Sequence, residues 1–246
     1  MTQATAGTVL ITGAAGGLGR AMVSELIRGG YRVVLVDRDA AALKAQADEI
    51  GSSAFPLQLD ITDSAKVDRL LELVPDAFNP IDILINNAGH DIGGRTRFDE
   101  GSPDDWANII QTNLIGLMRV TRALLPPMVA RNRGDVVNVS SISALRLVPD
   151  MAPYSASKAG VHMFTEILRG ELANTGIRVT EIMPGLTRTG IIKTRYRGDE
   201  AQTKAYFEQF GMALDPSDVA RSIVYALSQP PEVQVAQIVI LPTNRW

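Results

Sequence analysis

The chain contains no cysteine and only two histidines, His90 and His162. Disulfide bonds, thiolate catalysis and cysteine-ligated metals are therefore excluded. A metal site built from several histidines is not expected either, because such a site needs more imidazoles than the chain offers. We therefore expect no metal cofactor.

Long apolar runs and clusters of basic residues are also missing. The first apolar run, residues 9–11, is too short for a signal peptide or a membrane span, and no basic segment precedes it. No run of Lys or Arg suggests a nucleic-acid surface, and the net charge is −3. We expect a soluble, cytoplasmic protein that acts on a small molecule and binds neither nucleic acid nor membrane.

The composition is that of an ordinary globular protein, with 46% hydrophobic and 21% charged residues. A chain of 246 residues can bury roughly three quarters of the surface that its unfolded form exposes. No linker rich in Pro, Gly or Ser interrupts it. We expect one domain over residues 1–246, with a helical insert at about residues 190–212 that covers the substrate.

Short β-branched runs alternate with longer helical patterns along the chain. The apolar runs are continuous, which is typical of strands covered on both faces. Repeated strand-helix-strand units with right-handed crossovers predict an α/β fold, a Rossmann-type doubly wound parallel sheet of about seven strands with helices on both faces. The expected strands are 8–12, 32–36, 55–59, 81–85, 135–140, 177–183 and 237–241, and the expected helices are 17–28, 40–49, 64–76, 103–131, 154–174, 191–210 and 216–228.

A glycine-rich turn joins the first strand to the first helix. Glycine permits the tight turn and the close approach of a pyrophosphate, and the helix N-terminus supplies N–H donors. A turn used only for helix–sheet packing would look similar, but its place in a strand-turn-helix unit favours a dinucleotide. The expected phosphate-binding residues are Gly13, Gly17, Leu18 and Gly19.

Asp37 closes the second strand, 18 residues after Gly19. A carboxylate there can accept hydrogen bonds from the adenosine ribose and would repel a 2′-phosphate, which favours NAD over NADP. Arg38 could instead pair with that phosphate, so NADP stays open. Asp37 could also serve only as a turn residue or as the N-cap of the next helix.

Tyr154 and Lys158 lie four residues apart, so a helix places them on one face. A free tyrosine has a pKa near 10, and a neighbouring ammonium or a cationic nicotinamide would lower it. The pair could then exchange a proton with an alcohol. On its own, such a pair usually lies on the protein surface by chance and has no catalytic role.

Two further polar residues change that interpretation. Ser141 closes a strand at the carboxyl edge of the sheet, where open α/β folds bind ligands. Asn113 interrupts the apolar stripe of a helix, so its amide is either a satisfied core group or part of a polar relay.

Together these residues resemble the short-chain dehydrogenase/reductase family over nearly the whole chain, from about Val9 to Leu241. The matching elements are Thr12-Gly13 with Gly17-Leu18-Gly19, Asn86-Asn87-Ala88-Gly89, Asn113, Ser141, Tyr154 with Lys158, and Pro184-Gly185. The resemblance implies hydride transfer between a nicotinamide cofactor and an alcohol/carbonyl pair.

The resemblance also implies roles for single residues. Tyr154 would be the acid/base, Lys158 would lower its pKa and hold the nicotinamide ribose, Ser141 would polarise the carbonyl, and Asn113 would hold a relay water. Ser140 is the rival of Ser141, but the spacing to Tyr154 favours Ser141. The remaining cofactor contacts would come from Asp60, Ile61, Asn87, Ala88, Gly89, Pro184, Gly185, Thr187 and Thr189, although Asp60 could instead cap a helix.

The C-terminal segment departs from the glycine-rich end of many family members. It resembles the subgroup of hydroxy-acid and serine dehydrogenases and carbonyl reductases, many of which prefer NADP. An NADPH-dependent carbonyl reductase is therefore the main alternative. A non-catalytic dinucleotide sensor is a second alternative, although such proteins usually lose the Tyr, Lys or Ser that are all present here.

The substrate wall should come from loops at the carboxyl edge and from the insert. Its candidates are His90, Ser143, Arg146 and Arg195. The two arginines could bind a carboxylate, which suggests a small polar or anionic alcohol, although packed histidine and surface arginine are the ordinary alternatives. Family members commonly assemble as dimers or tetramers through helices that correspond to 103–131 and 154–174. We therefore expect a homo-oligomer, to which the tail ending in Trp246 could contribute.

Overall fold

The computed structural model describes residues 6–243, so Trp246 and its expected subunit contact lie outside the described residues. Within that range seven strands form one parallel sheet in the order β3-β2-β1-β4-β5-β6-β7. The Rossmann-type α/β fold is thus confirmed. The strands are β1 Thr8–Thr12, β2 Arg32–Asp37, β3 Ala54–Gln58, β4 Ile83–Asn86, β5 Gly134–Val139, β6 Ile177–Pro184 and β7 Gln237–Ile240.

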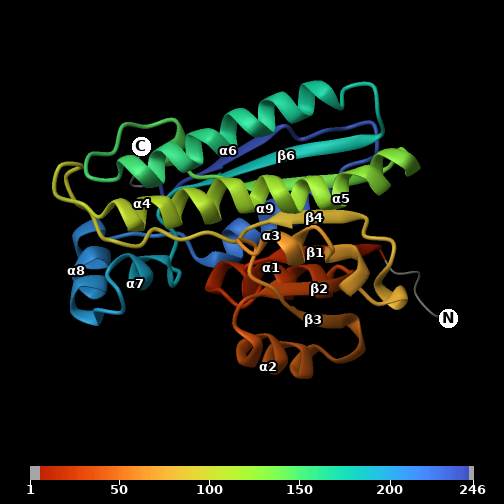
Figure 1. Cartoon of the computed structure of the whole chain (residues 1–246), viewed down its shortest axis with the longest axis horizontal. Helices are drawn as coiled ribbons and strands as arrows, with labels where there is room; N and C mark the ends of the chain where they lie inside the picture. The colour runs from red at the N-terminus through yellow and green to blue at the C-terminus, as the bar shows by residue number, and fades with distance from the viewer. Residues whose placement is uncertain (1–5, 244–246) are drawn as a thin grey trace.

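Helices cover both faces of this sheet (Figure 1). Helices α1 (Gly17–Arg28), α2 (Ala40–Ile50) and α9 (Pro216–Leu227) pack on one face, around buried side chains such as Leu26, Val33 and Ile223. Helices α5 (Leu117–Arg131) and α6 (Ala152–Glu171) pack on the other, where Leu84 and Leu124 are buried. The central strands are buried on both sides because both helical layers contribute apolar faces, which explains their continuous apolar runs.

The expected helix 64–76 is wrong as a continuous element. Helix α3 covers only Ser64–Val67, and short 3-10 turns follow at Leu70–Leu73 and Asp76–Phe78. Val74 is extended, with φ −90° and ψ 123°. It precedes Pro75, and a proline ring clashes with a helical residue before it.

The expected helix 103–131 contains an irregularity at Asn113. Helix α4 (Pro103–Ile110) passes through a π-helical turn, Gln111–Gly116, into α5. Such single π-turns often occur at functional sites. Asn113 lies in this turn and is fully buried.

The expected helix 191–210 is divided into α7 (Ile191–Arg195) and α8 (Glu200–Phe210). Arg197 and Gly198 between them have positive φ values of 52° and 91°. Asp199 then caps α8 by accepting a hydrogen bond from the Gln202 N–H. The other expected elements differ from the observed ones by at most three residues at either end.

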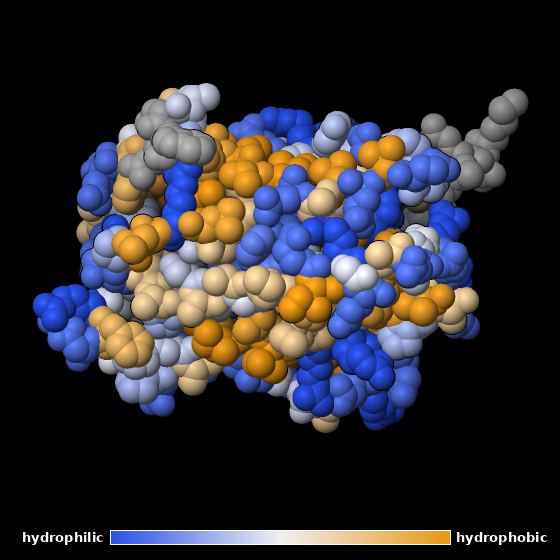
Figure 2. Space-filling model, turned by 90° about the horizontal axis from the view of Figure 1, so that it is seen from above, coloured by the Kyte–Doolittle hydropathy of each residue, from blue (hydrophilic) through white to orange (hydrophobic). Residues whose placement is uncertain are grey.

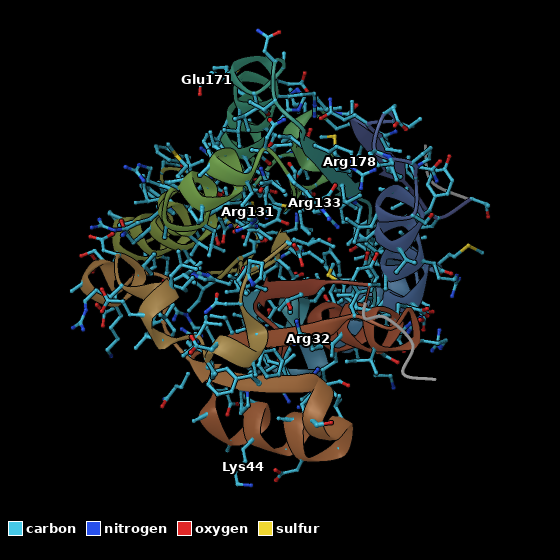
Figure 3. The ribbon with its side chains drawn as sticks, turned by 90° about the vertical axis from the view of Figure 1, so that its right-hand side faces the viewer. Arg32, Lys44, Arg131, Arg133, Glu171 and Arg178 are labelled. Atoms are coloured by element: carbon cyan, nitrogen blue, oxygen red, sulfur yellow. The ribbon has the colours of Figure 1, made fainter. Side chains whose placement is uncertain are left out.

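Figure 3 looks onto the end of the molecule where the strands begin, and it shows several arginines there. Arg178 pairs with Asp135 at 2.6 Å and donates to the Gln229 carbonyl, which ties β6 to the segment after α9. Arg131 donates to the Ile81 carbonyl. These side chains are engaged in packing the amino ends of the strands. Among the described helices, none has the length and apolar character of a membrane span.

Candidate active site

A cavity of about 840 Å³ lies at the carboxyl ends of the strands. Its size falls within the range of ligand pockets, roughly 300–1,000 Å³. Of the residues expected at the site, it is lined by Gly13, Gly17, Leu18, Gly19, Asp37, Arg38, Asp60, Ile61, Asn87, Ala88, Gly89, His90, Ser141, Ser143, Tyr154, Lys158, Pro184, Gly185, Thr187, Thr189 and Arg195. The structure thus brings together residues that are up to 182 positions apart in the sequence (195 − 13).

The glycine turn forms one wall of the cavity. Gly13 has φ +68°, and a Cβ there would lie 2.8 Å from the Ala88 Cα atom. A Cβ on Gly19 would lie 2.1 Å from the Gly13 carbonyl oxygen, so neither position accepts a side chain. Gly16, the N-cap of α1, gives the helix no side-chain acceptor. The N-terminus of α1 therefore faces the cavity as an anion site.

Asp37 lies at the end of β2 with its carboxylate held in place. Oδ2 accepts a hydrogen bond from the Ala15 N–H at 3.0 Å and Oδ1 accepts one from the Asp39 N–H at 3.2 Å. The N-cap of α2 is Asp39, whose side chain accepts from the Ala42 N–H. The alternative that Asp37 caps this helix is therefore wrong.

Asp60 is exposed at the same end of the cavity. Its Oδ1 accepts hydrogen bonds from the Thr62 N–H and hydroxyl at 2.9 and 2.8 Å. Asp63, not Asp60, caps α3. Arg38 is exposed beside Asp37, and its carbonyl accepts a hydrogen bond from Gln58.

Asn87 connects β4 to the glycine turn. Its side-chain amide donates to the carbonyls of Thr12 and Gly13, both at 3.0 Å. The Thr12 hydroxyl accepts from the Asn87 and Ala88 N–H groups at 3.1 Å. The Asn-Asn-Ala-Gly segment thus fixes the shape of the turn.

Ser141, Tyr154 and Lys158 form the polar floor of the cavity. The Ser141 hydroxyl hydrogen-bonds the Tyr154 side chain. The Lys158 Nζ donates to the Val139 carbonyl at 2.9 Å and lies 5.9 Å from the centre of the Tyr154 ring. Ser140 points elsewhere, because its hydroxyl donates to the Lys158 carbonyl at 3.1 Å. The structure therefore places Ser141, rather than Ser140, against Tyr154.

Burial moves the pKa values of both titrating groups in this cluster. It raises the pKa of Tyr154 to about 12, and Asp91 adds to the increase while the Ser141 hydrogen bond opposes it. It lowers the pKa of Lys158 to about 8, with Glu181 and Asp91 opposing. Burial thus favours the protonated phenol in the protein without a cofactor, and the lowering of its pKa by Lys158 stays a prediction.

Asn113 links the loop after β4 to helix α6. Its Oδ1 accepts from the His90 N–H, and its amide donates to the His90 carbonyl, both at 2.9 Å. The amide also donates to the Ser157 hydroxyl at 3.1 Å, which in turn donates to the Tyr154 carbonyl at 2.7 Å. Asn113 thus positions the loop against the helix that carries Tyr154.

Arg195 reaches the cavity from α7 and is only 4% exposed. Its Nε donates to the Asp91 Oδ2 at 2.7 Å, and its guanidinium lies over the Tyr206 ring at 4.9 Å. Its Nη1 is buried and has no partner among the described residues. Burial acts to lower the pKa of Arg195, but Asp91 and Tyr206 together raise it. The guanidinium therefore stays a cation.

The other three candidates for the substrate wall differ from one another. The Nε2 of His90 lies 3.2 Å from the Thr112 hydroxyl, and burial lowers the pKa of this imidazole. Ser143 donates to the Ser141 hydroxyl at 2.9 Å and so extends the polar floor. Arg146 is not among the residues that line the cavity.

Asp91 and Tyr206 were not expected at the site. Asp91 is 2% exposed, and burial raises its pKa although Arg195 opposes the shift. Its position next to His90 was a signal available in the sequence. Its partner lies 104 residues away, so the pair itself could not be recognised without the fold.

Comparison with known proteins gives a consistent result. A family model described as short chain dehydrogenase matches residues 7–200. A probable NADP-dependent dehydrogenase of Haemophilus influenzae is 35% identical, over 96% of this chain and 93% of its own length. An NADP-dependent 3-hydroxy acid dehydrogenase of Salmonella typhi is 33% identical, over 96% of this chain and 95% of its own.

The solved structures are similar over the same extent. The closed form of a serine dehydrogenase complexed with NADP+ has a TM-score of 0.94 and 33% sequence identity, covering 97% of this chain and 96% of that one. Serine dehydrogenase from Escherichia coli has a TM-score of 0.85 and 32% identity, covering 97% and 99%.

Proposed function

Because the chain belongs to the short chain dehydrogenase family and is an oxidoreductase of that family, we propose that it transfers a hydride between NAD(H) and a small secondary alcohol or its ketone. The observation that carries the proposal is the Ser141–Tyr154–Lys158 cluster, which lies in the same cavity as the glycine turn and the N-terminus of α1. The end of the cavity at the glycine turn can bind a phosphate, and the end at Ser141, Tyr154 and Lys158 can transfer a proton.

The residues at the dinucleotide end fit such a cofactor. A Cβ on Gly17 would project into the space before Thr189, 3.7 Å from its Cα atom, so the turn leaves this space open by lacking a side chain. Gly13, Gly17, Leu18 and Gly19 would hold the pyrophosphate, and Asp60, Ile61 and the segment Asn87–Gly89 would line the adenosine side. Pro184, Gly185, Thr187 and Thr189 would border the nicotinamide, which when bound accepts a hydride from the carbinol carbon or returns one to the carbonyl.

The proton would move through Tyr154. In ketone reduction the protonated phenol, whose pKa is about 12, can donate to the carbonyl oxygen while Ser141 orients that oxygen by a hydrogen bond. In alcohol oxidation the phenolate must accept the proton, and a positive charge beside the ring favours this form. Lys158 supplies one such charge from within 6 Å of the ring. Asn113 would hold a relay water in the role that the sequence suggests, and its contacts with His90 and Ser157 fix its position.

Asp37 supports NAD as the preferred cofactor. Its two oxygens are held by the N–H groups of Ala15 and Asp39, so the carboxylate cannot turn away from an incoming 2′-phosphate. That phosphate would meet a fixed negative charge. NADP is the second candidate, since two relatives and a similar solved structure carry it in their names and Arg38 lies next to Asp37.

Arg195 supports a hydroxy acid or keto acid as the substrate. Arg195 lines the cavity and its buried Nη1 has no partner among the described residues, so a substrate carboxylate would supply the missing acceptor. The names of the 3-hydroxy acid and serine dehydrogenases among the similar proteins agree with this choice. Helices α7 and α8 would then form a lid, with Arg195 reaching down to the substrate.

The exposed apolar side chains of two helices support a homo-oligomer. Met163 and Ile167 on α6, and Ile115 and Met118 around the π-turn, are between 39% and 55% exposed. Figure 2 views this face from above and shows apolar side chains gathered among polar ones. A second copy of the chain is the occupant we propose for it.

The central test is Tyr154→Phe, read with NADH and a panel of keto acids by the absorbance of the reduced cofactor. We expect turnover to fall by about 10²- to 10⁴-fold, the usual contribution of a general acid. NADH binding, followed by its fluorescence, should be retained. Tyr225→Phe, on the exposed face of α9, is the matched control. Unchanged turnover in Tyr154→Phe would refute the mechanism.

A further inference from the structure

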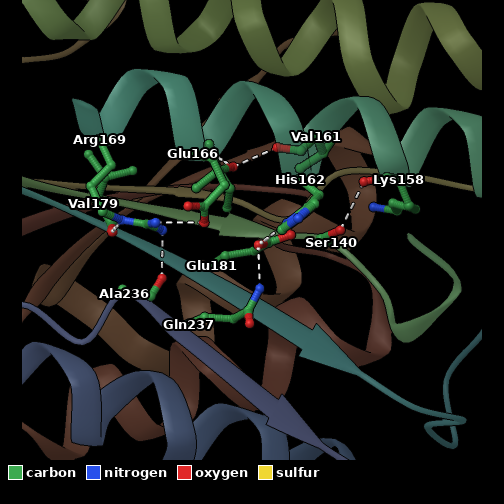
Figure 4. A network of polar contacts seen from close by, with 12 residues as sticks. Ser140, Lys158, Val161, His162, Glu166, Arg169, Val179, Glu181, Ala236 and Gln237 are labelled. Carbon is green, nitrogen blue, oxygen red and sulfur yellow. Dashed lines mark hydrogen bonds and ion pairs between the residues drawn. The ribbon is translucent and has the colours of Figure 1, made fainter. Parts of the chain in front are cut away.

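Three potential metal ligands converge outside the cavity, where α6 packs on β6 beside the edge strand β7 (Figure 4). His162 and Glu166 lie on α6, and Glu181 lies on β6. One ligand atom from each residue lies within 4.8 Å of the other two. None of the three belongs to the catalytic cluster described above.

Glu181 is the unusual member of this group, because its side chain is completely buried. Its Oε2 accepts hydrogen bonds from the His162 Nδ1 at 2.8 Å and from the Gln237 Nε2 at 3.1 Å. Its Oε1 is buried and has no partner among the described residues. A buried carboxylate oxygen without a donor is costly, so an additional cation would stabilise it.

His162 and Glu166 stand one helical turn apart, on the same face of α6. Their side chains are 23% and 42% exposed, so an ion can reach the site from solvent. Ligand atoms around a zinc ion lie about 3.4 Å apart for bonds of about 2.1 Å, so the separation of up to 4.8 Å must contract by as much as about 1.4 Å here. Glu166 is the member that can move, because it is the most exposed of the three.

Arg169 currently holds Glu166, with 2.6 Å between its Nη1 and the Glu166 Oε1. The same guanidinium donates to the Val179 and Ala236 carbonyls at 3.0 and 2.7 Å. Arg169 therefore keeps backbone acceptors if Glu166 turns toward a metal. The guanidinium then has hydrogen-bond acceptors but no carboxylate partner, which is a cost that zinc binding must offset.

We propose that His162, Glu166 and Glu181 form a binding site for a zinc ion. The two carboxylates balance the charge of a divalent cation, and the imidazole favours zinc over magnesium or calcium, which prefer oxygen ligands alone. Gln237 orients the Glu181 carboxylate from outside the ligand set. If zinc binds at the His162 Nδ1, the ring proton that now faces Glu181 is carried by Nε2 instead.

A site with one histidine and two glutamates is compatible with the scarcity of histidine in this chain. That scarcity also limits competing zinc ligands in the experiment, since His90 is the only other imidazole and no thiol is present. Zinc at this position would join α6, which carries Tyr154 and Lys158, to β6. It would stabilise the folded protein because the unfolded chain does not bring the three ligands together.

The test uses the full chain, freed of metals with a chelator and dialysed. Zinc is titrated by calorimetry, and thermal unfolding is measured with and without it. We expect one zinc per chain and a higher Tm with zinc. His162→Gln and Glu166→Gln should each weaken binding at least tenfold and remove the Tm increase. Glu171→Gln, an exposed glutamate near the end of the same helix, is the matched control and should behave as the wild type.

Two results would overturn the proposal. One is the absence of zinc binding to the wild-type chain at micromolar concentrations. The other is binding that His162→Gln and Glu166→Gln leave unchanged, with circular dichroism showing that both variants are folded. Loss of zinc binding in His90→Gln alone would place the ion elsewhere and would equally refute the assignment.

Discussion

Arg195, which lines the cavity, forms a buried ion pair with Asp91, with 2.7 Å between the Arg195 Nε and the Asp91 Oδ2. The two side chains are 4% and 3% exposed. The pair joins α7 to the loop after β4, where Asn113 also binds through His90. Asp91 engages Nε and Tyr206 lies over the guanidinium, so Nη1 is the group left for a ligand.

Arg195→Gln should therefore discriminate between acidic and neutral substrates. We expect kcat/KM for a 3-hydroxy acid to fall about 100-fold, since a hydrogen bond between charged groups contributes roughly 1.5–3 kcal/mol. The methyl ester of the same acid should change little. Steady-state kinetics with the acid and its ester, measured in parallel, would show the difference.

Two further variants make this comparison decisive. Arg195→Gln combined with Asp91→Asn avoids leaving Asp91 unpaired in the interior, which costs about 3–5 kcal/mol by itself. Arg197→Gln removes a neighbouring arginine that pairs with Asp105 and does not line the cavity. Equal losses for acid and ester in the double variant would contradict a carboxylate-binding role for Arg195.

Asp37→Ala should relax the choice between the two nicotinamide cofactors. Without the fixed carboxylate, kcat/KM with NADP should rise relative to that with NAD by at least tenfold, or about 1.4 kcal/mol. Initial rates at equal concentrations of NAD and NADP give this ratio. Asp39→Ser, which keeps the cap of α2, should leave the ratio unchanged. A wild-type enzyme that already prefers NADP would show our cofactor assignment to be wrong.

The sequence predicted the sheet well because its strands are buried on both faces. Continuous apolar runs such as Val9–Ile11 are stable only where the strand is buried on both faces, and they located the strands to within one or two residues. The cofactor and catalytic residues follow strand ends, and parallel strands bring their carboxyl ends to one edge. The positions of these residues at strand ends in the sequence were therefore enough to predict that the fold brings them together.

Features set by tertiary contacts could not be predicted in this way. The stripe around Asn113 has ordinary helical spacing, yet the hydrogen bonds to the His90 backbone accompany a π-turn there. The pair of Asp91 and Arg195 joins a loop to helix α7, and the two residues are 104 positions apart in the sequence. By contrast, the break before α8 had a local signal, since Gly198-Asp199 is a typical turn and N-cap pair.

Ile167→Glu should weaken the assembly that we propose for the α5–α6 face. A carboxylate buried between two copies loses its hydration without gaining a partner. We expect the mass measured by light scattering to fall toward that of one chain, 26.5 kDa, at micromolar concentration. Leu73→Glu, an exposed leucine in the 3-10 turn Leu70–Leu73, is the control and should keep the wild-type mass. A wild-type protein that is already monomeric would refute the proposal.

Lys158 should make the stability of the cofactor-free protein rise with pH between pH 8 and 9.5. Burial lowers its pKa from 10.5 to about 8, so in this interval the unfolded chain binds one more proton than the folded one. Unfolding then becomes less favourable as the pH increases, by about 2 kcal/mol over 1.5 pH units. Tyr154 acts in the opposite direction only above pH 10, because its pKa is raised from 10 to about 12.

Urea unfolding at pH 7 and pH 9.5 measures this effect, with Lys158→Met as the reference. Methionine fills much of the same volume without a titrating group, so the variant should be the more stable protein at pH 7. The difference between variant and wild type should shrink toward pH 9.5, where the wild-type ammonium has lost its proton in the folded state. Parallel pH profiles for the two proteins would refute the lowered pKa of Lys158, since contacts such as that with the Val139 carbonyl would then offset the cost of burying the ammonium.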